Sequence, residues 1–304
     1  MKVVTLGTGG AIPTPGRNLP AMALQREGEL FLFDCGEGAQ MQIIRSGLGF
    51  GRLRAIFISH LHGDHVVGLP GLLMTLSQSS REKPLHIIGP PGIARYVQIS
   101  MDCLGFDADF EVEVAETKGG RVWQGRGYWI EAVPGDHNVF TLVYVLKEGK
   151  RPGKFLVEKA LSLGVPEGPL FRELQAGRDV RLSDGRVIHP QEVLGSPRRG
   201  RKMVYAVDTR PCDQVVEISQ GADLLVHDGM FSDQLREEAN QKGHSTVVQA
   251  AGVARRAGVE KLVLTHISPR YRDQDDLLLE EARRVFPNVI IAEDLMEFEI
   301  PVHK

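Results

Sequence analysis

Short apolar runs recur along the chain and are separated by polar segments that contain glycine. The runs are rich in Val, Ile and Leu, and several of them end directly in a histidine or an aspartate. Runs of this length bounded by turn-forming residues are typical of β-strands. The pattern predicts strands over residues 2–6, 30–34, 54–59, 85–89, 128–133, 141–146, 202–207, 223–227, 261–266 and 288–292.

Other stretches carry apolar residues at a spacing of three and four, which is typical of amphipathic helices. The pattern predicts helices over residues 66–79, 92–105, 232–243, 246–258 and 275–286. Strands that alternate with helices in this way indicate an α/β fold built from packed layers. We therefore expect one domain that spans residues 1–304.

One segment, from Lys147 to Lys202, departs from this rhythm because it is rich in glycine, proline and charge. We interpret it as an insertion that projects from the domain as a flexible arm; an ordinary long surface connection is the alternative. Basic residues gather near both of its ends: Lys150, Arg151 and Lys154 at the first, and Arg198, Arg199, Arg201 and Lys202 at the second.

The composition is that of a globular protein with a substantial core, with 42% hydrophobic and 25% charged residues. The formal net charge of -3 does not by itself indicate a nucleic-acid-binding protein, although an average can hide a local basic patch. Three cysteines without a CxxC pair suit a reducing cytoplasm. The N-terminus lacks the features of a signal peptide, and no apolar run approaches the ~18 residues of a membrane helix, so we expect no membrane association.

The most informative stretch is SHLHGDH, residues 59–65, which follows a predicted strand. His60 and His62 alternate, so both can face one side, while Gly63 permits a turn that presents Asp64 and His65 to a neighbouring position. Such crowding makes sense if two adjacent cations share the loop. Imidazole and carboxylate ligands without thiolate suit Zn²⁺, with Mn²⁺ or Fe²⁺ as competitors.

Two metal ions need more ligands than this loop supplies. His137, Asp208 and His266 each lie just past an apolar strand, as His60 does. That repeated placement predicts one composite site. His227, at the end of another strand, is a further candidate, and His244 lies in a glycine-containing loop before a helix.

These residues resemble the HxHxDH signature of the metallo-β-lactamase superfamily. The resemblance extends nearly end to end to the ribonuclease Z family, whose members mature the 3′ end of tRNA. It is carried, in order, by the sequences LGTGGAIPTPGRN, FDCGEGAQMQ, VDTRP, GHST and LTHISPRY. The joint order of these motifs is more specific than HxHxDH alone.

The resemblance implies an αββα sandwich with two Zn²⁺ ions, or Mn²⁺, per subunit. It assigns one ion to His60, His62 and His137, and the other to Asp64, His65 and His266, with Asp208 bridging the two. It also implies hydrolysis of a phosphodiester by a metal-activated hydroxide, which leaves a 3′-hydroxyl on the tRNA. In this scheme Asp64 accepts the proton of the attacking water, and His244 donates a proton to the leaving oxygen or stabilises the transition state.

Further roles follow from the same comparison. Asp34 is expected to orient a ligand histidine, and His227 to be structural. Ser268, Arg270 and Tyr271 are expected to contact phosphate or brace the site. Two motifs depart from the family pattern: the stretch PTPGRN lacks the usual lysine, which leaves open whether CCA-bearing tRNA ends are spared, and HDGM replaces the element HEAT.

The segment 147–202 resembles the family's flexible arm, or exosite, with Gly168-Pro169 as its turn and its basic residues as tRNA contacts. The resemblance also implies a homodimer. One alternative is another hydrolase of this fold that acts on a small phosphodiester, a sulfate ester or a lactone, although a small substrate needs no such arm. A non-catalytic RNA-binding protein and a redox or di-iron protein are the remaining alternatives; the first is disfavoured because all the ligand positions are filled.

Overall fold

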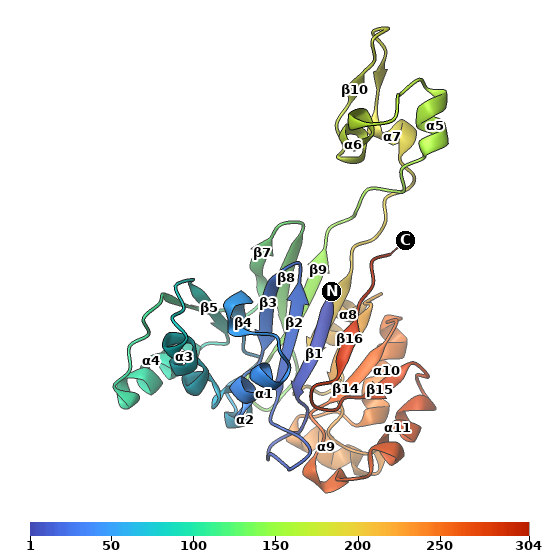
Figure 1. Cartoon of the computed structure of the whole chain (residues 1–304). Helices are drawn as coiled ribbons and strands as arrows, with labels where there is room; N and C mark the ends of the chain where they lie inside the picture. Colours follow the sequence, from blue (N-terminus) through green and yellow to red (C-terminus); the bar gives the residue numbers. More distant parts are fainter. Residues whose placement is uncertain (304) are drawn as a thin grey trace. The chain divides into compact units, whose positions relative to one another are not determined.

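The computed structural model describes residues 1–303 and divides into two compact units. The main unit comprises residues 1–146 and 202–300, and the arm unit comprises residues 147–201 with 301–303. Figure 1 shows the elements of both units. Each unit has its own buried apolar cluster, so each is described by itself.

Two seven-stranded sheets form the centre of the main unit within the described residues. The first sheet has the order β16 (Glu297–Glu299), β1 (Lys2–Gly7), β2 (Ala21–Arg26), β3 (Glu29–Phe33), β4 (Leu53–Phe57), β5 (Leu85–Gly89) and β6 (Val112–Glu116). The second has the order β15 (Val289–Ile291), β14 (Leu262–Thr265), β13 (Leu224–Asp228), β12 (Lys202–Ala206), β9 (Leu142–Glu148), β8 (Tyr128–Pro134) and β7 (Gly120–Gly125). Pairing is parallel from β3 to β6 and from β12 to β15.

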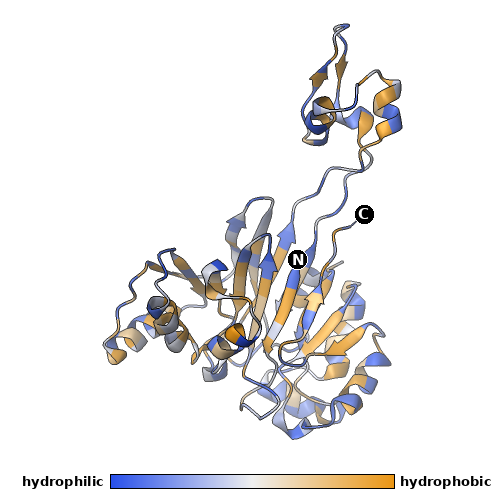
Figure 2. Cartoon of the chain, viewed as in Figure 1, coloured by the Kyte–Doolittle hydropathy of each residue, from blue (hydrophilic) through white to orange (hydrophobic). Residues whose placement is uncertain are grey.

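The strands are apolar on both faces because each sheet is covered on both sides. Successive side chains point to opposite faces of a strand. In β3, Phe31 therefore joins the apolar cluster between the sheets, whereas Leu32 joins the cluster beneath the helices of the first sheet. In β12, Tyr205 lies in the same inter-sheet cluster and Val204 lies in the cluster beneath the helices of the second sheet. Figure 2 shows this apolar character along the inner strands.

Helices cover the outer face of each sheet, which completes four layers. The first sheet is covered by α1 (Ala39–Arg45), α2 (Gly63–Val66), α3 (Leu69–Gln78) and α4 (Ile93–Leu104). The second is covered by α8 (Asp213–Ser219), α9 (Arg236–Lys242), α10 (Val247–Ala257) and α11 (Asp275–Arg283). Single 3₁₀ turns are η1 (Phe50–Arg52), η2 (Asp233–Leu235) and η3 (Pro269–Tyr271). The predicted αββα sandwich is thus confirmed.

All ten predicted strands and the predicted helices are present with small shifts at their ends. In the main unit, the sequence analysis missed β2, β6, β7, β16, α1 and α8. β2 has the sequence AMALQR, whose residues favour helices, and tertiary pairing between β1 and β3 overrides that preference. Among residues 1–303, no helix combines the length and the apolar character that are needed to cross a membrane.

The arm unit contains α5 (Val157–Ser162), α6 (Pro169–Gln175), β10 (Val180–Arg181), β11 (Val187–Ile188) and α7 (Pro190–Val193). Its small core includes Ala160, Leu174 and Val193. The expected Gly168-Pro169 turn begins α6: Gly168 adopts a φ of 132° and Pro169 occupies the first helical position, where its missing N–H costs nothing.

The basic residues of the arm fall into two groups. Lys150, Arg151, Lys154 and Arg199 are exposed. Arg201 instead is only 7% exposed, and its guanidinium donates to the carboxylate of Glu148 at 2.7 and 2.8 Å.

Two of the residues expected to contact RNA have protein partners. Arg201 is held in a buried ion pair within the arm unit. Lys202 belongs to β12 of the main unit, and its Nζ donates to the carbonyl of Gln220 at 2.8 Å. Because the polar heads of Arg201 and Lys202 already have protein partners, the exposed basic residues are the better candidates for RNA contacts. The guanidinium of the half-buried Arg198 also has a protein partner, since its Nε donates to the carbonyl of Pro152 at 3.1 Å.

Candidate active site

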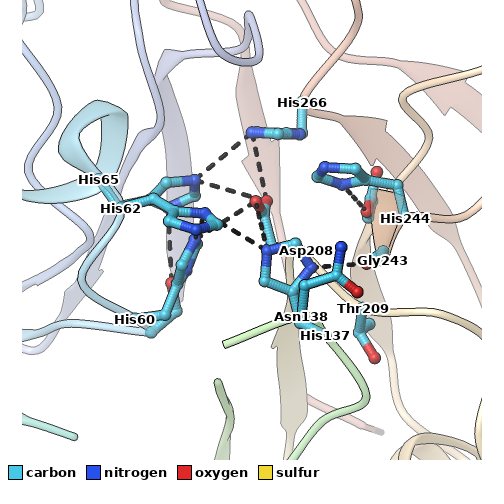
Figure 3. A network of polar contacts seen from close by, with 12 residues as sticks. His60, His62, His65, His137, Asn138, Asp208, Thr209, Gly243, His244 and His266 are labelled. Carbon is cyan, nitrogen blue, oxygen red and sulfur yellow. Dashed lines mark hydrogen bonds and ion pairs between the residues drawn. The ribbon is translucent and has the colours of Figure 1, made fainter. Parts of the chain in front are cut away.

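The candidate ligands lie where strands of the two sheets end (Figure 3). Because β12, β13 and β14 are parallel neighbours, their carboxyl ends share one edge of the second sheet. Asp208 follows β12, and His266 directly follows β14. Both adopt a left-handed backbone, with φ of 49° and 61°, as does Asp34 after β3, with φ of 57°. Such conformations are uncommon outside glycine and concentrate at functional sites.

The two carboxylate oxygens of Asp208 face two different groups of donors. Oδ2 lies 3.4 Å from Nε2 of His60 and 3.8 Å from Nε2 of His137. Nδ1 of His62 lies 3.0 Å from Nε2 of His60 and 3.3 Å from Nε2 of His137. The donor atoms of these four residues all lie within 4.8 Å of one another. They form the first donor group.

The second donor group lies on the other side of the same carboxylate. Oδ1 of Asp208 is 3.2 Å from Nε2 of His266 and 3.4 Å from Nε2 of His65. Oδ2 of Asp64 is 3.4 Å from the same nitrogen of His266 and 3.6 Å from that of His65. The structure therefore brings together all seven of the residues that the sequence analysis named as ligands.

A hydrogen bond on the far side of the His137 ring decides which of its nitrogens faces inward as an acceptor. Nδ1 of His137 donates to the carbonyl of Gly243 at 2.7 Å, since a carbonyl can only accept. Burial lowers the pKa of His137 and keeps the ring neutral. Its Nε2 therefore presents a lone pair toward His62 and Asp208.

This arrangement fits divalent cations. Within residues 1–303, Oδ1 of Asp208 is buried and has no hydrogen-bond partner. Lone pairs and carboxylate oxygens that face one another repel unless a positive charge lies between them. Nitrogen and oxygen donors without thiolate suit Zn²⁺, Mn²⁺ or Fe²⁺, as the sequence indicated.

Asp34 holds the imidazole of His65 from behind. Its Oδ2 accepts from Nδ1 of His65 at 2.7 Å and from the hydroxyl of Tyr205 at 3.0 Å, while Ser59 donates its N–H to Oδ1 at 2.7 Å. Ser59 Oγ, which donates to Asp34, lies 3.0 Å from Nδ1 of His60. Partners of this kind fix the tautomer and the orientation of ligand histidines.

His244 lies beside both donor groups. Its ring stacks on that of His266 with the centroids 5.2 Å apart, and it lies 5.1 Å from the ring of His137. Nδ1 of His244 is 2.8 Å from Oδ2 of Asp228. Burial lowers the pKa of His244, but the charge of Asp228 and the hydrogen bond to it outweigh burial and raise the pKa to about 9.

Asp228 was not named as a functional residue by the sequence analysis. The available signal was its place in HDGM, at the end of β13. His227, one residue earlier, is fully buried and donates its Nδ1–H to the carbonyl of Asp228 at 2.9 Å. It lies away from the two donor groups, in keeping with the expected structural role.

Arg210 is a second residue that the sequence analysis missed. Its side chain donates to Oδ1 of Asp136 at 3.0 Å and to Oδ1 of Asn138, the two residues that flank His137. Its backbone N–H donates to the carbonyl of Asp136 at 2.7 Å. Arg210 therefore fixes the loop that carries His137; its place two residues after Asp208 was the only sequence signal.

The residues after His266 have mixed roles. Tyr271 is buried, and its hydroxyl accepts from the N–H of Ser232 at 3.0 Å, so it braces the site. Ser268 is also buried. Arg270 is exposed and donates to Glu238 at 2.9 and 3.1 Å.

The PTPGRN loop borders a cleft of about 620 Å³ beside the site. Nη1 of Arg17 donates to Thr8 Oγ1 at 2.7 Å, and Nη2 pairs with Asp275. Asn18 donates its backbone and side-chain N–H groups to Asp294 at 2.7 and 2.8 Å. Arg17 and Asn18 of this stretch thus serve to fold the loop.

A family model described as anti-Pycsar protein Apyc1 matches residues 1–97, and one described as a beta-lactamase superfamily domain matches residues 179–267. Ribonuclease Z of Methanosarcina acetivorans is 48% identical over 301 residues, covering 99% of this chain and 98% of the relative. Ribonuclease Z of Myxococcus xanthus is 44% identical over 304 residues, with coverage of 99% and 98%.

A solved structure agrees with these relatives. The short form of human tRNase Z matches with a TM-score of 0.72 and 29% identity, covering 99% of this chain and 100% of that one. Similarity at this level over nearly the whole length, together with the shared fold, decides the family. The chain belongs to the ribonuclease Z family of the metallo-β-lactamase superfamily.

Proposed function

We propose that this chain is a metal-dependent hydrolase, an endoribonuclease that removes the 3′ trailer of tRNA precursors and leaves a 3′-hydroxyl on the tRNA. Family membership supports the substrate and the reaction. The observation that carries the mechanism is the divided donor set around Asp208 with His244 beside it.

Two Zn²⁺ ions per subunit fit this donor set, and Mn²⁺ is the alternative. His60, His62 and His137 would hold one, Asp64, His65 and His266 the other, and Asp208 both. Two divalent cations carry four positive charges, of which Asp64 and Asp208 offset two, so the centre favours an anionic phosphodiester over a neutral amide. When bound, the ions supply a water of lowered pKa and positive charge for the phosphoryl oxygens.

Two side chains handle protons. Burial raises the pKa of Asp64, but a hydrogen bond from His266 and the charge of His65 outweigh burial and lower it below its usual range, so the side chain is ionised at neutral pH. We assign to this carboxylate the proton of the attacking water. His244, whose pKa is about 9, is protonated at neutral pH and can donate to the leaving 3′ oxygen. Asp34 and Gly243 act through the rings that they hold.

The arm unit is proposed to bind the tRNA body away from the cut. Its exposed cations, Lys150, Arg151, Lys154 and Arg199, supply the charge that phosphate contacts require. Gly168 and Pro169 shape the start of α6 and are not expected to contact RNA directly. Another hydrolase of this fold that acts on a small ester would gain nothing from such a unit.

We propose a homodimer whose interface lies on the main unit. Met41 and Ile44 on α1 are 47% and 54% exposed, and Met74 on the neighbouring α3 is 38% exposed. These apolar side chains suit burial against a second copy. Light scattering is expected to give the mass of two chains, and Ile44→Asp to lower it to one.

A cytoplasmic location is proposed because the substrate is a tRNA precursor and because Cys35, Cys103 and Cys212 are free thiols. It can be checked by fractionation of the source cells.

The decisive experiment is cleavage of an end-labelled tRNA precursor with and without a chelator, with the cut mapped to the nucleotide. A metal-dependent cut after the discriminator nucleotide, with a 3′-hydroxyl, supports the proposal. No cut of the precursor alongside fast hydrolysis of a small ester would instead place the chain among the small-substrate hydrolases of this fold.

A further inference from the structure

Among the Phe, Tyr and Trp side chains of residues 1–303, that of Phe140 alone is largely exposed, at 44%. The remaining Phe, Tyr and Trp side chains of the described chain are buried or half-buried, as large apolar groups usually are. The main-unit core therefore does not explain the position of Phe140. Its place in the fold is informative, because it lies three residues after the candidate ligand His137.

The loop that carries Phe140 is closed at both ends by backbone hydrogen bonds. Gly135 donates its N–H to the carbonyl of Thr141 at 3.0 Å. Leu142 donates its N–H to the carbonyl of Ser59 at 2.9 Å, and Ser59 immediately precedes His60. Phe140 therefore belongs to a closed loop whose backbone is anchored beside His60 and which also carries His137.

The same loop is held rigidly against the turn after β12. Arg210 binds both the backbone and the side chain of Asp136, and the N–H of Asp136 donates to Thr209 Oγ1 at 3.0 Å. Figure 3 shows Asn138, Thr209 and Gly243 around His137. A side chain on such a braced loop is pre-organised, so a partner can pack on it without a large ordering cost.

Two further apolar side chains close to candidate ligands in the chain are exposed. Val139 is 40% exposed and adjoins Phe140. Leu61 is 36% exposed and lies between His60 and His62 in the chain. The loops that carry the candidate ligands thus also carry exposed apolar side chains, with one aromatic ring among them.

We propose that Phe140 is a stacking platform for an unpaired nucleobase next to the scissile phosphate, either the discriminator base or the first base of the trailer. The inference rests on the proposed function. The donor groups and His244 act on the phosphate and carry no means of placing the bases on either side of it. Unpaired bases of RNA are commonly held by stacking on aromatic side chains, which tolerates any base.

The test combines protein variants with altered RNA. Phe140→Ala is expected to lower kcat/KM for a tRNA precursor about 10-fold. Phe140→Tyr keeps a ring and is expected to restore activity, whereas Phe140→Leu keeps only apolar bulk and is not. Ile99→Ala, which removes an equally exposed apolar side chain from α4, is the matched control and is expected to cleave like the unchanged protein.

Altered RNA substrates identify which base stacks on Phe140. An abasic nucleotide is placed either at the discriminator or at the first trailer position. At the stacked position it is expected to slow the unchanged protein by the same factor as Phe140→Ala, and to slow that variant no further, because the two changes remove one contact. At the other position its effect is the same in both proteins.

Three results would overturn the inference. The first is that the effects of Phe140→Ala and of the abasic nucleotide on cleavage are fully additive at both RNA positions. The second is equal activity of the Phe140→Leu and Phe140→Tyr variants. The third is a fall in particle mass with Phe140→Ala, which would place the ring between two copies of the chain. Metal content and thermal midpoint measured on each variant show that it is folded. If the unchanged protein fails to cut the precursor with metal present, the proposed function fails instead.

Discussion

The Nδ1–H of His244 donates to the carboxylate of Asp228 across 2.8 Å, and both residues are largely withdrawn from solvent. The carboxylate fixes the tautomer and leaves Nε2 as the nitrogen that can serve the substrate. It also determines the protonation state, because its charge and hydrogen bond outweigh burial and raise the pKa of His244 to about 9. A proton donor is thereby available throughout the neutral range.

Replacement of Asp228 by Asn is expected to shift the pH dependence of turnover. The change removes the charge that raises the pKa of His244, so the pKa falls toward the ordinary value of 6.5. Loss of the donor proton limits the rate on the alkaline side, and the alkaline limb of kcat should therefore move to lower pH. Profiles of kcat on a tRNA precursor measure the shift. An unchanged limb would remove His244 as the donor, and Asp213→Asn, an exposed carboxylate, is the matched control.

His244→Ala is expected to retain the metals and lose turnover. The ring stacks beside His266 and belongs to neither donor group described above, so its loss leaves both groups intact. Loss of a general acid typically lowers the rate by about 10² to 10⁴. Metal analysis and single-turnover cleavage separate the two effects. Equal rates for the variant and the unchanged protein would eliminate the proposed role.

Asp208→Ala is expected to lose most of the bound metal and nearly all activity. Its carboxylate is the group that both donor sets share, and its two oxygens lie 3.2 to 3.8 Å from four different histidines. Removal leaves each set one ligand short and leaves the facing imidazoles without a bridging anion. Elemental analysis after dialysis measures the metal. Full metal content in the variant would contradict the bridging assignment.

Asp34→Asn is expected to weaken metal binding without abolishing it. The carboxylate accepts from His65, Ser59 and Tyr205, and an amide can replace only part of that set. Partners of ligand histidines typically contribute about 10-fold to 100-fold in metal affinity. Competition with a chromogenic chelator gives the affinity. Tyr205→Phe removes one donor and keeps the carboxylate, so its loss should be smaller; equal losses would point to a general packing defect.

The sequence predicted that these residues gather because each lies in a loop just past an apolar strand. β4, β12 and β14 belong to parallel runs, whereas β8, which precedes His137, pairs antiparallel with β7. The sequence could not predict Asp228 or Arg210 as partners, since those contacts depend on how loops far apart in the chain pack together. The strand β2 was not predicted for a different reason: its residues favour a helix, and only pairing with its neighbours makes it a strand. The pairing of Arg201 with Glu148 could not be foreseen either, because a run of basic residues does not reveal which member is paired.

Removal of the arm is expected to affect the natural substrate selectively. Residues 150–199 can be replaced by a short Gly-Ser linker, which keeps the buried pair between Glu148 and Arg201. Cleavage of a tRNA precursor should fall at least about 10-fold, and its salt dependence should become shallower by about one unit of slope for each lost phosphate contact. Hydrolysis of bis(p-nitrophenyl) phosphate should continue, because that substrate is too small to reach a second unit.

Point variants separate charge from fold in the arm. Lys150→Gln, Arg151→Gln and Lys154→Gln together remove exposed cations and are expected to reproduce part of the deletion's effect on the precursor. Arg178→Gln is the matched control, because that exposed arginine is already paired with Glu173. If the deletion slows the small diester as much as the precursor, the arm supports the main unit's structure. If the control equals the triple variant, the effect reflects overall charge and not contact at that end of the arm.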